Sequence, residues 1–168
     1  MMKNFAYPVR FVEFDDRFVR KSGEWLKDEE LRYLINLSEF DPEKQKIWVE
    51  YFRSNPDKCL VRGLEVDETP SGACGIKHIL SDENGNKIGE YWGYIGDKSL
   101  RGKGIGGQMV DEMIQSAREL GISKLYLKVM EYNLPARKLY IKKGFEVVSG
   151  GQEIIMEKKF SENQQHSR

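Results

Sequence analysis

The sequence predicts an α/β (α+β) chain in which a mixed, mostly antiparallel sheet carries helices on both faces. First, the middle of the chain holds the short apolar runs CLVRGLEV, ACGIKHIL and IGEYWGYIG, separated by turn-forming segments, which indicates an antiparallel meander. Second, the spacing of apolar residues becomes helical from Ile105 onward. Third, only the segment from about Ile88 to Met130 has the strand–loop–helix–strand order of a parallel crossover. We therefore expect six or seven strands and about four helices.

The N-terminal part of the chain is expected to contain one strand and two helices. The apolar strand lies around Phe11 to Phe14, and the segment DEELRYLINL has helical spacing with Asp28 in position to cap it. The next helix begins more clearly, because Asp41 is a suitable N-cap and Pro42 suits the first helical position. Its apolar face is predicted to consist of Ile47, Trp48, Tyr51 and Phe52.

The C-terminal half continues as helix, strand, helix, strand and strand. The helix that begins at Ile105 ends at Gly121, and the strand KLYLKVM follows it. A short helix then lies between Pro135 and Gly144, and the runs FEVVS and EIIMEKKF complete the sheet. The apolar stripe of the first of these helices consists of Ile105, Met109, Met113, Ile114, Ala117 and Leu120.

The chain is expected to form a single domain over residues 1–160, followed by a disordered polar tail over residues 161–168. Its 168 residues are near the usual size of one domain, and no repeat or low-complexity linker divides them. The tail is expected to be disordered because SENQQHSR is polar and free of aromatic residues. Cys59 and Cys74 lack metal-ligand spacing, so we expect buried, reduced thiols and no metal site.

Charge and hydropathy argue against nucleic-acid and membrane partners. Lys plus Arg balances Asp plus Glu at 27 each, so no overall field attracts nucleic acid or an anionic membrane. No apolar stretch approaches the roughly 20 residues of a membrane span, and the N-terminus does not resemble a signal peptide. We therefore expect a cytoplasmic protein.

The glycine-rich segment SLRGKGIGGQM has three interpretations that involve a phosphate. Gly102, Gly104 and Gly107 satisfy the dinucleotide pattern G-x-G-x-x-G, but too few residues follow to complete that fold. A P-loop is excluded on chemistry, because Lys103 is followed by glycine and not by the Ser or Thr that holds magnesium. The pattern R-x-x-G-x-G, from Arg101 to Gly106, can instead hold a diphosphate on backbone N–H groups at the positive end of the next helix. A flexible turn without a ligand remains the alternative.

The loop and a second block together resemble the GNAT superfamily of acyl-CoA-dependent N-acetyltransferases. Arg101 to Gly106 match the signature Q/R-x-x-G-x-G/A between the fourth strand and the third helix. The segment NLPARKLYIKKGF is similar to the second block, N-x-x-A-x-x-L-Y-x-K-x-G-F. The matching positions are Asn133, Ala136, Leu139, Tyr140, Lys142, Gly144 and Phe145. The resemblance, strong from Ile88 to Phe145, implies the GNAT fold, in which two central strands splay apart.

The resemblance also implies acetyl-CoA as the cosubstrate, bound without a metal. Backbone groups of the loop would take the CoA pyrophosphate, Asn133 would contact the pantetheine arm, and Tyr140 would face the thioester sulfur. The implied CoA-binding residues are Tyr94, Ile95, Gly96, Arg101, Gly102, Lys103, Gly104, Ile105, Gly106, Gly107, Asn133, Arg137 and Tyr140. Because dimers are common in this family, a homodimer is also an expectation.

Two residues are candidates for proton transfer to and from the reacting groups. An alkyl ammonium must lose a proton before it attacks a thioester, and Glu90, on the same strand face as Trp92 and Tyr94, is the candidate base. The Tyr140 hydroxyl is the candidate donor to the leaving thiolate. The alternatives are a solvated or salt-bridged glutamate and a core tyrosine. His78, which alternates with Ile76 and Leu80, could line the acceptor pocket, replace Glu90 as base, or be a hydrogen-bonded strand histidine.

The acceptor amine is less clearly indicated than the donor. The N-terminal pattern is similar to the branch that includes ribosomal-protein N-terminal acetyltransferases and acetyltransferases of nucleotide-linked amino sugars, and the elements W-L-x-D-x-E-L and Q-x-x-W favour the amino-sugar side. We expect an amine-bearing small molecule as acceptor. A protein N-terminus, a polyamine or an antibiotic, and a module that binds CoA without catalysis, are the alternatives.

Overall fold

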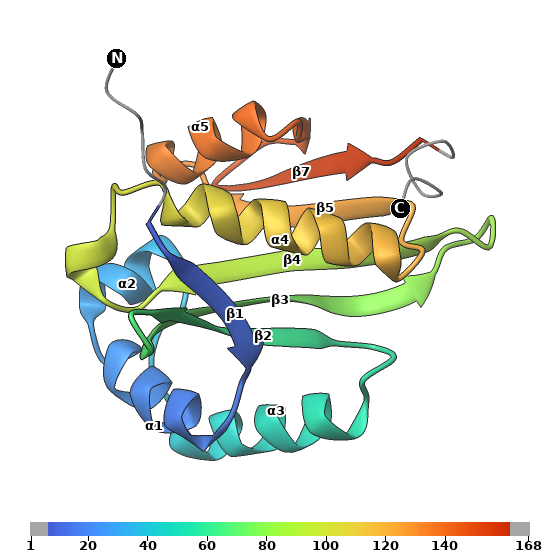
Figure 1. Cartoon of the computed structure of the whole chain (residues 1–168). Coiled ribbons are helices and arrows are strands. Elements are labelled where there is room, and N and C mark those ends of the chain that lie inside the picture. The colour runs from blue at the N-terminus through green and yellow to red at the C-terminus, as the bar shows by residue number, and fades with distance from the viewer. Residues whose placement is uncertain (1–6, 162–168) are drawn as a thin grey trace.

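The computed structural model describes residues 7–161 and shows a seven-stranded mixed sheet with the strand order β1-β2-β3-β4-β5-β7-β6 (Figure 1). The strands are β1 (Val9–Glu13), β2 (Leu60–Val66), β3 (Thr69–Ser81), β4 (Lys87–Ile95), β5 (Lys124–Met130), β6 (Glu146–Ser149) and β7 (Glu153–Lys159). The helices are α1 (Asp16–Trp25), α2 (Glu29–Leu34), α3 (Pro42–Ser54), α4 (Ile105–Glu119) and α5 (Leu134–Lys142), with a 3-10 turn at Lys98–Leu100. The predicted fold class is confirmed, with five α-helices in place of about four.

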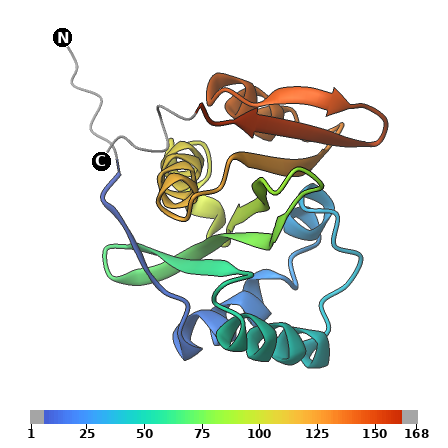
Figure 2. The ribbon, with the colours of Figure 1, turned by 90° about the vertical axis from the view of Figure 1, so that its right-hand side faces the viewer.

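The sheet lies between two layers of helices. Helices α1 and α3 cover one face, where Phe14 and Phe18 pack with Trp48 and Phe52 (Figure 2). Helix α4 covers the other face, and its buried residues Met109 and Met113 belong to the larger core. Helix α5 packs against this second core. The expected helices on both faces are therefore confirmed.

The helix ends follow the predicted capping chemistry. Asp28 accepts a hydrogen bond from the Glu30 amide at 3.2 Å and begins α2. Asp41 accepts one from the Glu43 amide at 2.9 Å, and Pro42 occupies the first turn of α3. Gly121, which follows α4, has a positive φ of 74°, a conformation that glycine adopts without steric cost.

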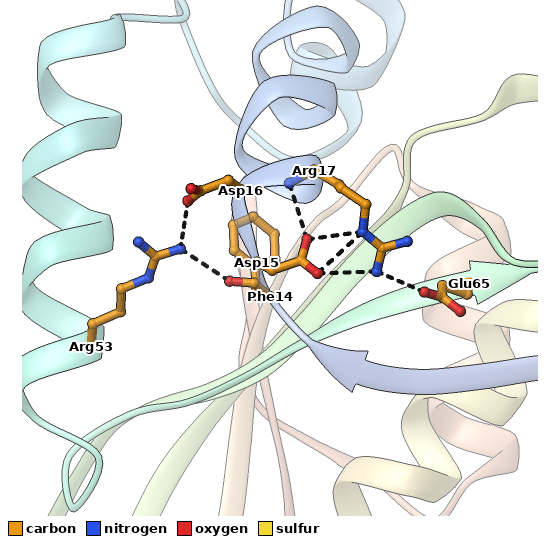
Figure 3. Close-up of polar contacts among 6 residues, drawn as sticks. All are labelled: Phe14, Asp15, Asp16, Arg17, Arg53 and Glu65. Carbon is orange, nitrogen blue, oxygen red and sulfur yellow. Dashed lines mark hydrogen bonds and ion pairs between the residues drawn. The ribbon is translucent and has the colours of Figure 1, made fainter.

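Helix α1 was not expected from the sequence. Its fully buried positions are Phe18 and Ser22, so a polar residue interrupts the apolar pattern by which a helix is normally detected. Asp15 caps the helix, and Arg17 joins this cap to Glu65 of β2 at 2.8 Å (Figure 3). These polar contacts, together with the packing of Phe18, Val19 and Trp25 in the smaller core, position α1 against the sheet.

The apolar face of α3 differs from the prediction. The side chains of Ile47 and Tyr51 are 66% and 47% exposed, whereas Trp48 and Phe52 pack onto the sheet and Val49 is buried. The predicted set combined residues from two sides of the helix. The sheet contact decides which side is buried.

Strand β3 is longer than predicted and contains a bulge. The segment between the first two apolar runs, DETPSG, was expected to form a turn. Only Asp67 and Glu68, both with positive φ, do so, and the strand begins at Thr69. The pairing with β4 shifts between Lys77 and Leu80, and His78 lies in this bulge with a φ of 53°. The predicted alternation was therefore wrong: Ile76 is buried, but His78 and Leu80 are exposed.

The two central strands splay apart, as the resemblance implied. Strands β4 and β5 are parallel and pair at three positions, ending where Glu90 faces Tyr126. Beyond that point β4 continues to Ile95 and β5 continues to Met130 without pairing to each other. An opening between the strands therefore begins next to Glu90.

The described residues also bear on the remaining expectations. Cys59 and Cys74 are buried and free, as predicted. No helix within residues 7–161 has the length and apolar character needed to cross a bilayer. The predicted tail, apart from residue 161, lies outside the described part of the chain.

Candidate active site

Backbone groups of β4 point into the opening between β4 and β5. The Gly96 amide donates to the Ser71 carbonyl of β3 at 2.8 Å. Because hydrogen-bonded rungs alternate in an antiparallel pair, the backbone groups of Tyr91, Gly93 and Ile95 are directed away from β3. These groups therefore face the space that β5 has left.

A cavity of about 580 Å³ extends from this opening to the glycine loop. We call it the donor cavity. Its walls come from β4, from the loop and first turn of α4, from α5 and from α2. The lining residues used below are Glu30, Leu31, Leu34, Ile35, Tyr91, Gly93, Ile95, Arg101, Gly102, Gly104, Asn133 and Tyr140.

The glycine loop leaves room for a large anion beside backbone donors. Gly102 and Gly104 have φ values of 74° and 81°, and a Cβ added to either would meet no atom within 4 Å. The first-turn amides of α4, from Ile105 to Gly107, have no acceptor within the helix. Such amides at the positive end of a helix suit a diphosphate, so these residues fit the CoA pyrophosphate.

The basic side chains of the loop contact other protein groups, although Arg101 also lines the donor cavity. Arg101 donates to the Ile95 carbonyl at 3.3 Å and also lies 3.9 Å from Asp28. Lys103 Nζ lies 5.5 Å from the ring centre of Tyr7, in a cation–π contact. The charge that both were expected to add beside the phosphate is thus directed at the protein itself.

The second block contributes Asn133 and Tyr140 to the donor cavity but places Arg137 apart. Asn133 caps α5 and donates to the Leu34 carbonyl at 3.3 Å. Tyr140 packs edge-on against Tyr91 with ring centres 6.0 Å apart, and burial raises the pKa of Tyr140 to about 12. Arg137 donates to the Glu131 carbonyl at 2.9 Å and does not line the donor cavity.

A second cavity, of about 330 Å³, meets the donor cavity at Tyr91, Gly93 and Tyr140. We call it the acceptor cavity. Glu90 lines it and is 5% exposed, with its carboxylate 3.6 Å from Lys77 Nζ. Burial and the charge of Glu90 raise the pKa of Tyr126, which is the last paired residue of β5 and lies opposite Glu90. The two candidate catalytic residues, Glu90 and Tyr140, therefore border one cavity.

An aromatic groove continues from the acceptor cavity toward α1 and α3. The groove has a volume of about 350 Å³ and shares Lys77, Trp92 and Gly93 with the acceptor cavity. Trp48 and Tyr94 form its walls, and Trp48 lies edge-on to Trp92 with ring centres 5.4 Å apart. A flat or apolar group next to the acceptor amine could lie in this groove.

The structure also brings to the site residues that the sequence did not single out. The bulge in β3 lets Lys77 and His78, although adjacent in sequence, both line the acceptor cavity. Leu34 and Ile35, from the segment DEELRYLINL that was predicted as a helix, line both cavities. No sequence motif marks these residues, because they belong to a bulge and to a short helix. Among residues 7–161, no three His, Cys, Asp or Glu side chains group as a metal site.

Comparisons with known proteins point to one family of enzymes. Residues 22–145 match the profile described as "Acetyltransferase (GNAT) family". The human protein named alpha/beta-tubulin-N-acetyltransferase 9 is 28% identical over 154 residues, covering 84% of this chain and 74% of that protein. The match to the mouse protein of the same name covers 63% of its length.

Solved structures support the fold. The N-acetyltransferase PseH of Campylobacter jejuni superposes with a TM-score of 0.65 at 18% identity, over 92% of this chain and 98% of that chain. A ribosomal-protein-alanine N-acetyltransferase from Brucella melitensis gives a TM-score of 0.70 at 19% identity, over 91% and 99% of the two chains. With the family profile spanning most of the chain, the protein belongs to the acetyltransferase (GNAT) family, a class of enzymes that use acetyl-CoA as their acetyl donor.

Proposed function

We propose that this chain transfers the acetyl group of acetyl-CoA directly to the primary amine of a small molecule, with Glu90 and Tyr140 moving the protons. The observation that supports this most is the meeting of the two cavities at Tyr140 and Gly93, one reaching the glycine loop and the other reaching Glu90. Acetyl-CoA supplies a thioester whose carbonyl carbon accepts the amine. The two reactants would meet in the opening between β4 and β5.

The residues at the junction have distinct roles in this proposal. Glu90 accepts the proton that the acceptor ammonium must lose before its nitrogen can attack. The new C–N bond forms as the C–S bond breaks, and Tyr140 donates its proton to the departing sulfur to give the free thiol of CoA. The nitrogen, which now carries one proton too many for an amide, returns that proton to the Tyr140 oxygen, and Glu90 releases its own proton to water. The Ile95 amide, which faces the opening, donates to the carbonyl oxygen as negative charge develops there.

The glycine loop would hold the pyrophosphate in this mechanism. The first-turn amides of α4 supply the donors, and Gly102 and Gly104 allow the backbone to approach closely. The pantetheine arm would follow β4 along the amides of Gly93 and Ile95, next to Asn133. Lys103 remains a candidate ligand for the phosphates of CoA that lie outside the loop. Arg137 remains a candidate CoA ligand only at the surface near Glu131.

The size of the acceptor cavity supports a small molecule. Its volume of about 330 Å³ is at the lower end for small-molecule sites, and the aromatic groove extends it by a space of similar size. An amino sugar fits these dimensions, and a nucleotide attached to it would lie along the groove.

A protein N-terminus is the second candidate, because the human relative is named for tubulin acetylation and one structural neighbour for a ribosomal protein. Thiol release from acetyl-CoA can be compared for nucleotide-linked amino sugars and for peptides with a free N-terminus. Faster turnover of the peptides by more than tenfold would overturn the small-molecule proposal.

The role of Glu90 is tested by Glu90→Gln, which keeps the side-chain shape and removes the base. We expect kcat to fall by about 10²-fold near neutral pH, while the affinity for acetyl-CoA is retained. Glu157→Gln is the matched control, because Glu157 is also a strand glutamate paired with a lysine, Lys124, at 3.4 Å, but lies outside both cavities. A wild-type rate in Glu90→Gln would remove this residue from the mechanism.

A further inference from the structure

Helix α2 forms one wall of the donor cavity and is too short to hold itself there. It has six residues, from Glu29 to Leu34, whereas isolated helices shorter than about 12 residues are marginal in water. Leu31 is its one fully buried residue. Yet Leu31, Leu34 and the following Ile35 line the donor cavity, and the last two also line the acceptor cavity. Contacts with other elements must therefore fix this wall.

The N-terminal end of α2 is fastened to the glycine loop by ion pairs. Lys98 Nζ lies 3.1 Å from Asp28 and 3.6 Å from Glu30. Arg101 lies 3.9 Å from each of the same two carboxylates. The buried Asp28 Oδ2 accepts no hydrogen bond within residues 7–161, which leaves the Arg101 guanidinium as the cation beside it.

Arg101 also holds the loop to β4. Its Nε and Nη2 atoms approach the Ile95 carbonyl at 3.4 and 3.3 Å. The Ile95 carbonyl faces the opening between the strands, so this contact bridges strand, loop and α2 at the mouth of the donor cavity. The Arg101 side chain is 23% exposed, as expected for a group surrounded by protein contacts.

The C-terminal end of α2 is fastened to the turn between β5 and α5. The Asn133 side-chain Nδ2 donates to the Leu34 carbonyl at 3.3 Å. The Tyr33 and Tyr132 rings stack with centres 3.9 Å apart, and the Tyr132 hydroxyl donates to the Tyr33 carbonyl. Asn133 and Arg101 thus hold opposite ends of one short helix.

We propose that Arg101 is a positioning residue that fastens α2 as a wall over the pantetheine arm, and that its side chain is not a phosphate ligand. The inference rests on the proposed binding of acetyl-CoA in the donor cavity. Loss of Arg101 would loosen the wall and expose the arm to water.

Two probes distinguish a positioning residue from a phosphate ligand. Acetyl-CoA carries the pyrophosphate, whereas S-acetylpantetheine carries the arm without any phosphate. In Arg101→Met we expect both probes to bind about fivefold more weakly, because the wall contacts the arm. Asp28→Asn, which keeps the helix cap and removes the charge, should also weaken the binding of both probes. Because the two residues share one contact, the double variant should bind each probe within about twofold of the more weakly binding single variant.

Hydrogen exchange gives a readout that does not depend on ligand binding. Amides 31–35 should exchange faster in Arg101→Met than in the wild type. Lys103→Met is the matched control, because it removes the other basic residue of the loop, whose side chain contacts Tyr7 and not α2. Exchange of residues 31–35 should be unchanged in this control.

The opposite pattern would overturn the inference. If Arg101→Met weakened acetyl-CoA alone and left both S-acetylpantetheine binding and exchange in α2 unchanged, Arg101 would be a phosphate ligand. Failure of the wild-type protein to bind acetyl-CoA would instead refute the proposed donor site. The exchange measurement would still report whether Arg101 fastens α2.

Discussion

Tyr140 is a residue whose surroundings suit the task proposed for it. Burial raises its pKa to about 12, and a phenol is neutral below its pKa, so the hydroxyl keeps its proton throughout the neutral range. We expect Tyr140→Phe to lower kcat by about 10²-fold, because the leaving thiolate loses its proton donor, while acetyl-CoA affinity changes by less than about threefold. Stopped thiol-release assays and calorimetric titration measure the two quantities. Unchanged kcat in a folded variant would return Tyr140 to the role of a packing aromatic.

The same pKa gives a pH dependence for the wild type. Since the proton-donating form is lost only as the pH rises through about 12, ionisation of Tyr140 should cause no fall of kcat below about pH 11. If kcat declined with rising pH well below pH 11, and this decline disappeared in the Tyr140→Phe variant, the raised pKa of Tyr140 would be contradicted. The profile should be recorded with saturating acetyl-CoA, so that binding does not contribute.

Helix α4 and its N-terminal glycines illustrate what a single element contributes. Gly104 and Gly121 flank this helix, both have positive φ, and a Cβ on either would meet no atom within 4 Å. Gly104→Val and Gly121→Val should therefore each lower the free energy of unfolding by about 1–2 kcal/mol through backbone strain. Only Gly104 borders the donor cavity, so only its variant should lose acetyl-CoA affinity, by tenfold or more.

The pair of variants separates binding from stability. Denaturant unfolding measures the loss of stability, and calorimetric titration measures the loss of acetyl-CoA affinity. Equal losses of acetyl-CoA affinity in the two variants would show that general destabilisation, and not the phosphate cradle, controls binding. Retained affinity in a folded Gly104→Val would remove the loop from the site.

The elements differ in how far the sequence predicted them, for physical reasons. The donor half is readable because Arg101–Gly107 and Asn133–Phe145 are continuous segments whose turn and capping residues specify their conformation. The acceptor half is assembled from a bulge in β3 and from α1, α2 and α3, which are distant in sequence. The side-chain pattern of a regular strand placed His78 in phase with Ile76, and a single inserted residue reversed that assignment.

At the scale of the whole molecule, the splay of the sheet determines where the cavities lie. The β4–β5 pairing ends at Glu90, so the sheet loses its continuity at the residue proposed as the base. The larger core, covered by α4 and α5, keeps the two halves of the sheet together beyond that point. Its packing, with Cys74, Met109 and Met113 almost completely buried, should therefore be required both for stability and for the shape of the opening.

Cys74 belongs to this core and reports on it without a substitution, whereas Cys59 is buried outside it. Cys59 and Cys74 are 8% and 0% exposed, and burial raises the pKa of both thiols, that of Cys74 to about 12. Because the thiolate is the reactive form and is present only as the pH approaches the pKa, a disulfide reagent at pH 8 should not modify Cys74 in the native protein. Modification of Cys74 should occur at the rate of unfolding and rise with guanidinium concentration along with the loss of ellipticity. Rapid modification of Cys74 without denaturant would show that the core beside the opening is accessible in the native state. If modification is slow, Cys74 does not contribute to the signal when a thiol reagent is used to measure the CoA released during turnover.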